Sequence, residues 1–266
     1  MKKKMLNILI TLSVIYIAVC ILLYLFQEKL LFHPERLADT YTFSFDSNFE
    51  EVWIPTADNE TLHGVLFKTA QPKGLIFYLH GNAGSVSSWG YVAPLYLSQG
   101  YDVFIPDYRG YGKSTGSINS QEQVYNDVQT AYAVMKTRYN EDRIIILGYS
   151  IGSGPAAWLA SQHHPRLLIL QAPYYNMSDL VKHKMRFVPE YILKYKFTTN
   201  KYLERCNMPV VVFHGNKDEV IYYGSSLKLE NEFKNSDRLV TLNGQGHNGI
   251  TDNRQYREEM VSILAD

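Results

Sequence analysis

Cysteine is scarce in this sequence, and so is any excess of charge of one sign. Cys20 and Cys206 are the only cysteines among 266 residues. Because the first lies in a long apolar segment and the second far downstream, no intramolecular disulfide framework is expected. Lysine and arginine number 26, as do aspartate and glutamate, and this balance gives no indication of a nucleic-acid partner. No metal site is visible in the sequence, and we expect neither a metal nor another cofactor.

Charge is also missing from residues 6–26, which form one uninterrupted and mostly apolar run. At about 1.5 Å per residue, a helix of this length spans the hydrocarbon core of a bilayer, which is about 30 Å thick. Lys2, Lys3 and Lys4 precede the run. The positive-inside rule therefore predicts that residues 1–5 stay in the cytoplasm and that the rest of the chain lies on the other side of the membrane.

A cleaved signal peptide is the main alternative for this segment, and it fits less well. A signal peptide has a shorter apolar core followed by small residues, whereas this run ends in Tyr24-Leu-Phe-Gln-Glu28. Lipoprotein cleavage at Cys20 is disfavoured because the apolar run continues beyond it. We predict a single-pass signal anchor over 6–26, a juxtamembrane connector over 27–45 and a folded domain over 46–266. The apolar residues of the connector are expected to pack at the membrane interface.

Within the folded domain, short β-branched and apolar segments alternate with segments typical of helices. An antiparallel hairpin is expected over 50–68. Further strands are expected near 74–80, 102–107, 143–148, 167–172, 209–214 and 238–242, and helices near 86–98, 119–138, 151–163, 223–234 and 253–264. This alternation is typical of an α/β fold, in which a mostly parallel sheet carries helices on both faces.

The segment over 143–157 indicates a nucleophile. An apolar strand runs directly into Gly148-Tyr-Ser-Ile-Gly152, and small residues typical of a helix follow. A Gly-x-Ser-x-Gly nucleophile elbow requires this context, because the tight turn lifts the serine hydroxyl out of the sheet. Ser150 is therefore the predicted nucleophile, on a strained turn at the positive end of a helix.

A second Gly-x-Ser-x-Gly match, Gly112–Gly116, lacks this context. Turn residues precede it in place of a strand, and Gly116-Ser-Ile-Asn119 follows in place of a helix. We therefore interpret Ser114 as a loop residue. The same stretch contains Gly-Lys-Ser, as a phosphate-binding loop does, but Asp107 stands where such a loop needs a glycine. A phosphate-binding loop is rejected on this ground.

A serine nucleophile needs a base, and the base needs an acid that orients it. Asp218 and Glu219 follow one predicted strand, and His247 lies in a glycine-rich loop after the next. Open parallel sheets place their sites past the carboxyl ends of strands, so we predict His247 as the base and Asp218 as the acid, with Glu219 as the weaker alternative. His80 and His214 each begin a His-Gly turn and are expected to shape loops at the edge of the site.

Acyl transfer also needs hydrogen-bond donors for the oxyanion that develops on the carbonyl oxygen. One predicted strand runs into His80-Gly-Asn-Ala-Gly84, a turn with glycines on both sides. The predicted donors are the backbone N–H groups of Asn82 and of Ile151, the residue after the nucleophile. Tyr149 and Tyr174 are expected to form part of the substrate wall.

Together these motifs resemble the alpha/beta-hydrolase superfamily. They are most similar to its membrane-anchored subgroup, which includes eukaryotic protein depalmitoylases and many bacterial relatives. The resemblance covers about residues 50–265 and rests on His80–Gly84, Asp107–Ser114, Gly148–Gly152, His214–Val220 and Gly246-His247. It implies the alpha/beta-hydrolase fold and the same triad and oxyanion donors that the residue types indicate. One departure is Gln171-Ala-Pro-Tyr174, where relatives often carry Glu-Ser-Pro-Phe.

Residues 173–207 interrupt the alternation of strands and helices, and the resemblance implies that such an insertion forms a small lid. The segment is rich in tyrosine, phenylalanine and methionine, and its basic residues include Lys182, Lys184, Arg186, Lys194 and Lys196. Two interpretations stay open. The insertion is either a solvated helix pair with ordinary surface lysines or an apolar acyl-chain wall whose basic rim faces anionic head groups.

The sequence therefore predicts a membrane-tethered serine hydrolase that cleaves carboxylic esters or thioesters through an acyl-enzyme, with acyl-chain substrates favoured. A serine peptidase of the same fold is the nearest alternative. An acidic cluster in the insertion would favour a peptidase, whereas this insertion is basic. A non-catalytic interaction module is a further alternative, but such a protein would have lost a member of the triad, and none is missing.

Membrane topology gives a first test. A reporter fused after the last residue should be active on the non-cytoplasmic side, because Lys2, Lys3 and Lys4 hold the N-terminus in the cytoplasm. Sequencing of the mature protein should recover the original N-terminal residues. Reporter activity in the cytoplasm, or cleavage near residue 27, would contradict the signal anchor.

Overall fold

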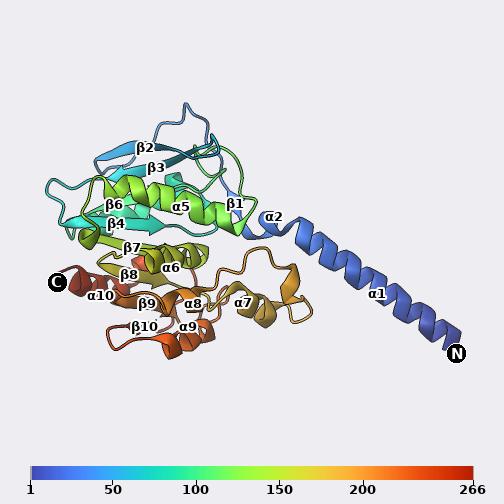
Figure 1. Ribbon diagram of the computed structural model, residues 1–266. Coiled ribbons are helices and arrows are strands. Elements are labelled where there is room, and N and C mark those ends of the chain that lie inside the picture. The colour runs from blue at the N-terminus through green and yellow to red at the C-terminus, as the bar shows by residue number, and fades with distance from the viewer. Residues whose placement is uncertain (1, 266) are drawn as a thin grey trace.

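One eight-stranded sheet organises the fold (Figure 1). The computed structural model describes residues 2–265, and Met1 and Asp266 lie outside the described residues. Across the sheet the strands follow the order β10-β9-β8-β7-β4-β6-β3-β2. Their bounds are β2 (Phe49–Pro55), β3 (Thr61–Phe67), β4 (Gly74–Leu79), β6 (Tyr101–Pro106), β7 (Ile144–Tyr149), β8 (Leu167–Gln171), β9 (Val210–Gly215) and β10 (Arg238–Leu242). β3 is antiparallel to β2 and β6, and the other pairings are parallel. The predicted hairpin and mostly parallel sheet are confirmed.

Side chains of the central strands alternate between two hydrophobic clusters, one on each face of the sheet. In β4, Leu75, Phe77 and Leu79 belong to one cluster, and Ile76 and Tyr78 belong to the other. The first cluster includes side chains of α5 (Gln121–Lys136), α6 (Ser153–Gln162), α8 (Thr199–Leu203) and α9 (Gly224–Leu229). The second includes side chains of α3 (Val86–Trp89), α4 (Ala93–Leu97) and α10 (Arg254–Ala265). Helices thus cover both faces, as predicted, and bury the apolar strands between them.

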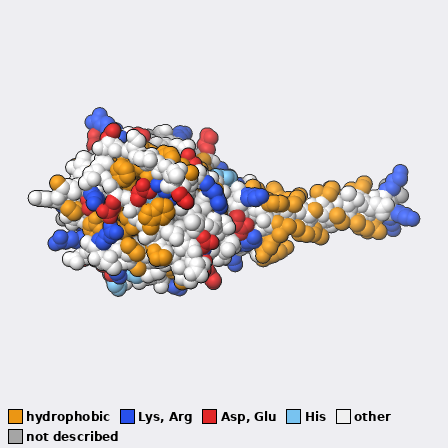
Figure 2. Space-filling view, turned by 90° about the horizontal axis from the view of Figure 1, so that it is seen from above, with side chains coloured by type: hydrophobic (Ala, Val, Ile, Leu, Met, Phe, Trp, Pro, Cys, Tyr) orange, Lys and Arg blue, Asp and Glu red, His pale blue; other side chains and the backbone are white. Residues whose placement is uncertain are grey.

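The N-terminal helix α1 (Lys2–Leu25) extends away from the domain, and none of its described side chains is buried (Figure 1). Figure 2 shows hydrophobic side chains along the helix and lysine side chains at its far end. By length and composition, α1 is long and apolar enough to cross a membrane. A short helix, α2 (Gln27–Leu31), follows it directly and leads into the domain.

The connector that follows α1 packs on the domain itself. Its strand β1 (His33–Pro34) pairs with β5 (Ala83–Gly84), next to the turn predicted to hold an oxyanion donor. Phe32 is buried in the hydrophobic cluster between the sheet and helices α5 and α6. Phe43 is buried in the hydrophobic cluster on the opposite face of the sheet. These contacts differ from the expected packing at the membrane interface. Burial in the protein core removes this apolar surface from water, as burial at the membrane interface would. The removal of apolar surface from water favours packing in both places.

Residues 173–207, called the insertion below, lie between β8 and β9. They contain α7 (Met177–Lys184), one turn of 3-10 helix (Glu190–Ile192) and α8. The insertion lies beside α2 (Figure 1), and the side-chain amide of Gln27 donates to the carbonyl oxygen of Ile192 at 3.0 Å. Segments far apart in the sequence therefore meet next to the end of α1.

β7 and α6 approach each other closely, and two glycines permit this approach. A Cβ atom on Gly148 would lie 2.5 Å from the Cβ of Ala156, and one on Gly152 would lie 2.3 Å from the carbonyl oxygen of Leu79. Both distances are far below van der Waals contact, so a side chain here would push α6 away from the sheet. The chain between β7 and α6 is consequently confined to a tight turn.

Gly152→Ala should lower the free energy of unfolding by about 1–3 kcal/mol, because overpacking forces the backbone to shift. Thermal unfolding of the detergent-solubilised protein measures the change. Gly246→Ala is a matched control, since a Cβ atom at Gly246 would have no neighbour closer than 3.9 Å. A Gly152→Ala protein that melts together with the wild type would contradict the steric constraint.

Candidate active site

Three of the predicted side chains lie past the carboxyl ends of parallel strands. Ser150 follows β7, Asp218 follows β9 and His247 follows β10. β9 and β10 are neighbours, and only β8 separates them from β7. In open parallel sheets the loops at this edge converge, so residues distant in sequence meet there.

Ser150 occupies the sharp turn between β7 and α6. Its φ is 53°, in the left-handed region that residues other than glycine rarely adopt. One turn of 3-10 helix, Ser150–Gly152, leads into α6. The hydroxyl of Ser153 donates to the carbonyl oxygen of Ser150 at 2.6 Å and closes the turn. The strained turn expected of a nucleophile elbow is therefore present at this serine.

His247 connects Ser150 with Asp218 through both nitrogens of its ring. Nε2 lies 3.0 Å from Ser150 Oγ, and Nδ1 lies 2.7 Å from Asp218 Oδ2. An ionised carboxylate only accepts hydrogen bonds, so it holds the proton of a neutral imidazole on Nδ1. Nε2 is then an acceptor that faces the serine hydroxyl. This geometry suits a histidine that removes the proton of the serine.

Asp218 is buried, and its surroundings keep it ionised. Burial alone would raise its pKa, but hydrogen bonds from His214, His247 and the Ile221 N–H bring the pKa below its usual range. Asp218 Oδ1 accepts from the N–H groups of Val220 at 2.8 Å and Ile221 at 2.9 Å. Because the pKa is lowered on folding, the ionised group stabilises the fold above its unfolded pKa of about 3.9. This contribution is lost as the pH falls through the lower folded pKa.

Two alternatives raised by the sequence lie outside this hydrogen-bonded chain. Glu219 is exposed, and its carbonyl oxygen accepts from the Lys184 ammonium of α7. Ser114 is buried in a loop, where its hydroxyl donates to the carbonyl oxygen of Asp107 and accepts from the N–H of His63, both at 2.8 Å. The geometry therefore favours Asp218 as the acid and Ser150 as the nucleophile.

A cavity of about 110 Å³ opens in front of Ser150, and Asn82 and Ile151 both line it. Ile151 is the second residue of the 3-10 turn, and the first N–H groups of a helical segment lack an acceptor within that segment. Asn82 is held through its carbonyl oxygen, in the peptide after its N–H, which accepts from the Tyr111 hydroxyl at 2.7 Å and from the His33 N–H at 2.8 Å. Both residues thus border the cavity into which an acyl substrate of Ser150 would have to enter.

Comparison with known families places the chain among the hydrolases. A family model described as serine aminopeptidase, S33 matches residues 70–203, which is half of the chain. The chain belongs to this family of hydrolases. Its fold is that of the alpha/beta-hydrolase superfamily, so the resemblance carried by the motifs is confirmed.

Relatives with similar sequences share most of the length of this hydrolase. Human alpha/beta hydrolase domain-containing protein 17C is 29% identical over 244 residues, covering 88% of this chain and 71% of the human protein. Uncharacterized protein R595 of Acanthamoeba polyphaga mimivirus is 27% identical over 245 residues, covering 82% of this chain and 81% of the viral protein.

Solved structures share the fold at lower sequence identity. An esterase of Pyrococcus furiosus superimposes with a TM-score of 0.71 at 19% identity, covering 88% of this chain and 97% of the esterase. Est1E from Butyrivibrio proteoclasticus, with bound ferulic acid, superimposes with a TM-score of 0.65 at 19% identity, covering 81% of this chain and 100% of Est1E. The architecture is therefore common to enzymes whose sequences differ widely.

The hydrolase holds the two predicted wall tyrosines in different positions. Tyr174 lines the cavity in front of Ser150, and its hydroxyl donates to the carbonyl oxygen of Ile151 at 3.1 Å. Tyr149 contacts the histidine loop, since its hydroxyl donates to the carbonyl oxygen of His247 at 2.6 Å and the two rings lie 5.5 Å apart. Tyr149 therefore supports the position of His247.

His214 has a more specific place than the loop-shaping role expected from the sequence. Its Nε2 lies 3.2 Å from Asp218 Oδ2 and 2.9 Å from the carbonyl oxygen of Ile221. Its Nδ1 lies 2.6 Å from Ser226 Oγ. A buried ring bonded on both sides fixes the position of the carboxylate. In the sequence, this contact is indicated by the position of His214 four residues before Asp218, in the same strand-end motif.

Leu30 and Leu31 of α2 line the Ser150 cavity, together with Met177 and Leu180 of the insertion. Sequence reasoning placed the two leucines only in the connector. Their signal was an apolar pair directly after Glu28 and Lys29, which follow the long apolar run, but no local pattern brings that pair to Ser150. One wall of the cavity thus comes from α2, the short helix that follows α1.

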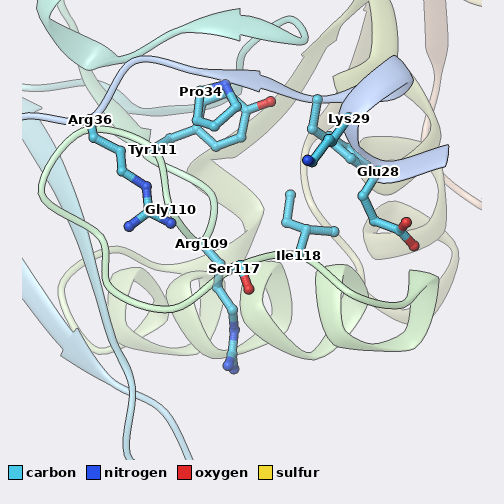
Figure 3. A pocket seen from close by; sticks show the side chains of 10 residues that line it. Glu28, Lys29, Pro34, Arg36, Arg109, Gly110, Tyr111, Ser117 and Ile118 are labelled. Carbon is cyan, nitrogen blue, oxygen red and sulfur yellow. The ribbon is translucent and has the colours of Figure 1, made fainter. Parts of the chain in front are cut away.

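A larger cleft, of about 390 Å³, lies elsewhere on the connector, and Ser150 is not among its lining residues. Figure 3 shows it between Glu28, Lys29 and Arg36 of the connector and the segment that carries Tyr111 and Ile118. Charged side chains border this cleft, in contrast with the cavity at Ser150. Within residues 2–265, no group of three or more His, Cys, Asp or Glu side chains is arranged to hold a metal ion.

Asp218→Asn should lower the turnover of a short-chain p-nitrophenyl ester by about four orders of magnitude, because the amide favours the wrong imidazole tautomer. Glu219→Gln is the matched control next to it in the chain and should retain most of the activity. Circular dichroism checks that both variants fold. If Glu219→Gln is the inactive variant and Asp218→Asn is active, the acid is the other residue.

Proposed function

We infer that this protein is a serine hydrolase that cleaves carboxylic esters or thioesters of acyl chains through an acyl-enzyme. One observation carries the proposal. Ser150, His247 and Asp218 form a hydrogen-bonded chain with separations of 3.0 Å and 2.7 Å. Membership in a hydrolase family supports an enzymatic role. An interaction module that had lost activity would have no reason to keep these three groups in working geometry.

The reaction follows from the groups around Ser150. His247 Nε2 accepts the proton as Ser150 Oγ attacks the substrate carbonyl carbon, and the N–H groups of Asn82 and Ile151 stabilise the oxyanion. His247 then gives the proton to the leaving alcohol or thiol, which leaves Ser150 acylated. A water molecule, deprotonated by His247, releases the carboxylic acid in the second half of the reaction. Asp218 stays ionised and holds the imidazole in the required tautomer.

The lining of the cavity supports an acyl substrate over a peptide with a free amino terminus. Its walls include Leu30, Leu31, Leu180, Val220 and Ile221, and no carboxylate is among the described residues that line it. An aminopeptidase needs an acceptor for the positive charge of the amino terminus. The description of the matching family keeps peptide hydrolysis as the second candidate, with an amide in place of the ester.

Membrane attachment completes the proposal. α1 is long and apolar enough to span a bilayer, and Lys2, Lys3 and Lys4 at its start favour a cytoplasmic N-terminus. The protein is then anchored once through residues 6–26, with the hydrolase domain on the non-cytoplasmic side. An ester or thioester derived from lipid would be within reach of such a domain.

Ser150→Ala should abolish labelling by a fluorophosphonate probe and hydrolysis of p-nitrophenyl butyrate, because it removes the hydroxyl that lies 3.0 Å from His247 Nε2. Ser114→Ala is the matched control and should keep both. An aminoacyl p-nitroanilide, tested beside the ester, separates esterase from aminopeptidase activity. Labelling that persists in Ser150→Ala would refute the mechanism, and faster cleavage of the anilide than of the ester would make the protein a peptidase.

A further inference from the structure

A second, smaller cavity adjoins the one at Ser150. Its volume is about 70 Å³, and it lies between α2 and the insertion. Leu30, Leu31 and Met177 line both cavities, so the two are separated by no more than shared side chains. The far part of the second cavity is lined by Leu23 of α1 and by Met185 of the insertion. Together the linings of the two cavities therefore extend from Ser150 to Leu23, near the end of α1.

We propose that these two cavities form one slot that binds a long acyl chain, and that the chain enters it from the bilayer at the end of α1. The substrate is then an ester or thioester whose acyl chain lies in the membrane, with its carbonyl carbon presented to Ser150. This proposal rests on the function proposed above and specifies its substrate class.

The chemistry of the lining fits a hydrocarbon chain. Among the ten lining residues of the second cavity, only Gln27 is polar. Both polar atoms of its amide already have a protein partner, because Nε2 donates to the carbonyl oxygen of Ile192 at 3.0 Å and Oε1 accepts from the N–H of Lys194 at 2.7 Å. The surface left to a ligand is therefore apolar, which favours methylene groups over polar ones.

Hydrogen bonds fix α2 as one wall of this slot. Besides the bonds of Gln27, the carboxylate of Glu28 accepts from the Lys194 ammonium at 3.0 Å and from the Tyr195 hydroxyl at 3.1 Å. These bonds hold α2, directly after α1, against the insertion. Met177 and Met185 lie in the lining, and the flexible thioether side chain of methionine lets an apolar site adapt to its ligand.

The position of the far end identifies the bilayer as the source of the chain. Leu23 lies within the apolar run over 6–26 and only two residues before α1 ends at Leu25. In the anchored protein, the lining of the slot therefore continues into the surface that faces hydrocarbon. The larger cleft in Figure 3 is bordered by Glu28, Lys29 and Arg36 and does not include Ser150, so it offers no comparable path.

Filling the slot tests this proposal. Full-length protein in phosphatidylcholine vesicles is assayed with p-nitrophenyl palmitate in the same vesicles and with p-nitrophenyl butyrate in solution. Val181→Trp and Met185→Trp should each lower the ratio of kcat/KM for palmitate to that for butyrate by about tenfold or more, since the indole occupies the space of the distal methylenes. Val261→Trp, at an exposed valine of α10, is the matched control and should keep the wild-type ratio.

The outcomes separate this proposal from the proposed function. If both slot variants keep the wild-type ratio while Ser150→Ala is inactive on both esters, the slot is refuted and the serine hydrolase stands. If Ser150→Ala hydrolyses both esters, the proposed function itself is refuted. Should Val181→Trp fail to fold, judged by circular dichroism, Met185→Trp decides alone, because it replaces a more exposed residue.

Discussion

The close approach of α6 to β7 and β4 is the constraint on which the rest of the site depends. Glycine at positions 148 and 152 lets the helix lie directly against the sheet, and the turn between them then takes a left-handed conformation at Ser150. Such a conformation is costly for a residue with a side chain, and it persists only where the surrounding structure holds it. Buried strands and helices on both faces supply that support. Because the position of Ser150 is fixed, the loops after β9 and β10 can hold their side chains at a defined distance from it.

The buried carboxylate of Asp218 shows how a charge is kept next to this core. A carboxyl group buried without partners would become protonated, but two backbone N–H groups and two histidine rings surround Asp218. Only one of the two rings, that of His247, also reaches Ser150. His214 and His247 thus contact the same carboxylate from the ends of two strands. His214 positions the acid, and His247 is the residue proposed to transfer the proton.

The N-terminal segment is part of the hydrolase as well as its proposed anchor. β1 pairs beside the turn that carries Asn82, and α2 supplies apolar side chains to the cavity at Ser150. α2 therefore connects the end of α1 with the proposed substrate site. A domain released from its anchor would keep α2 but lose Leu23 of α1 from the wall that the proposed acyl chain contacts.

The strands, the hairpin and the turn at Ser150 could be predicted from the sequence, because apolar segments and glycine spacing are local properties of the chain. The position after a predicted strand narrowed the choice of the acid to Asp218 or Glu219. A sequence pattern does not distinguish two neighbouring carboxylates, and only the fold directs one of them to His247. The contact of His214 with Asp218, and the place of Leu30 and Leu31 at Ser150, were likewise beyond sequence reasoning. The sequence by itself determined the fold class and the residue types of the site. The tertiary structure decided which segments form its walls, because contacts between distant segments depend on how whole elements pack, and no local pattern specifies that packing.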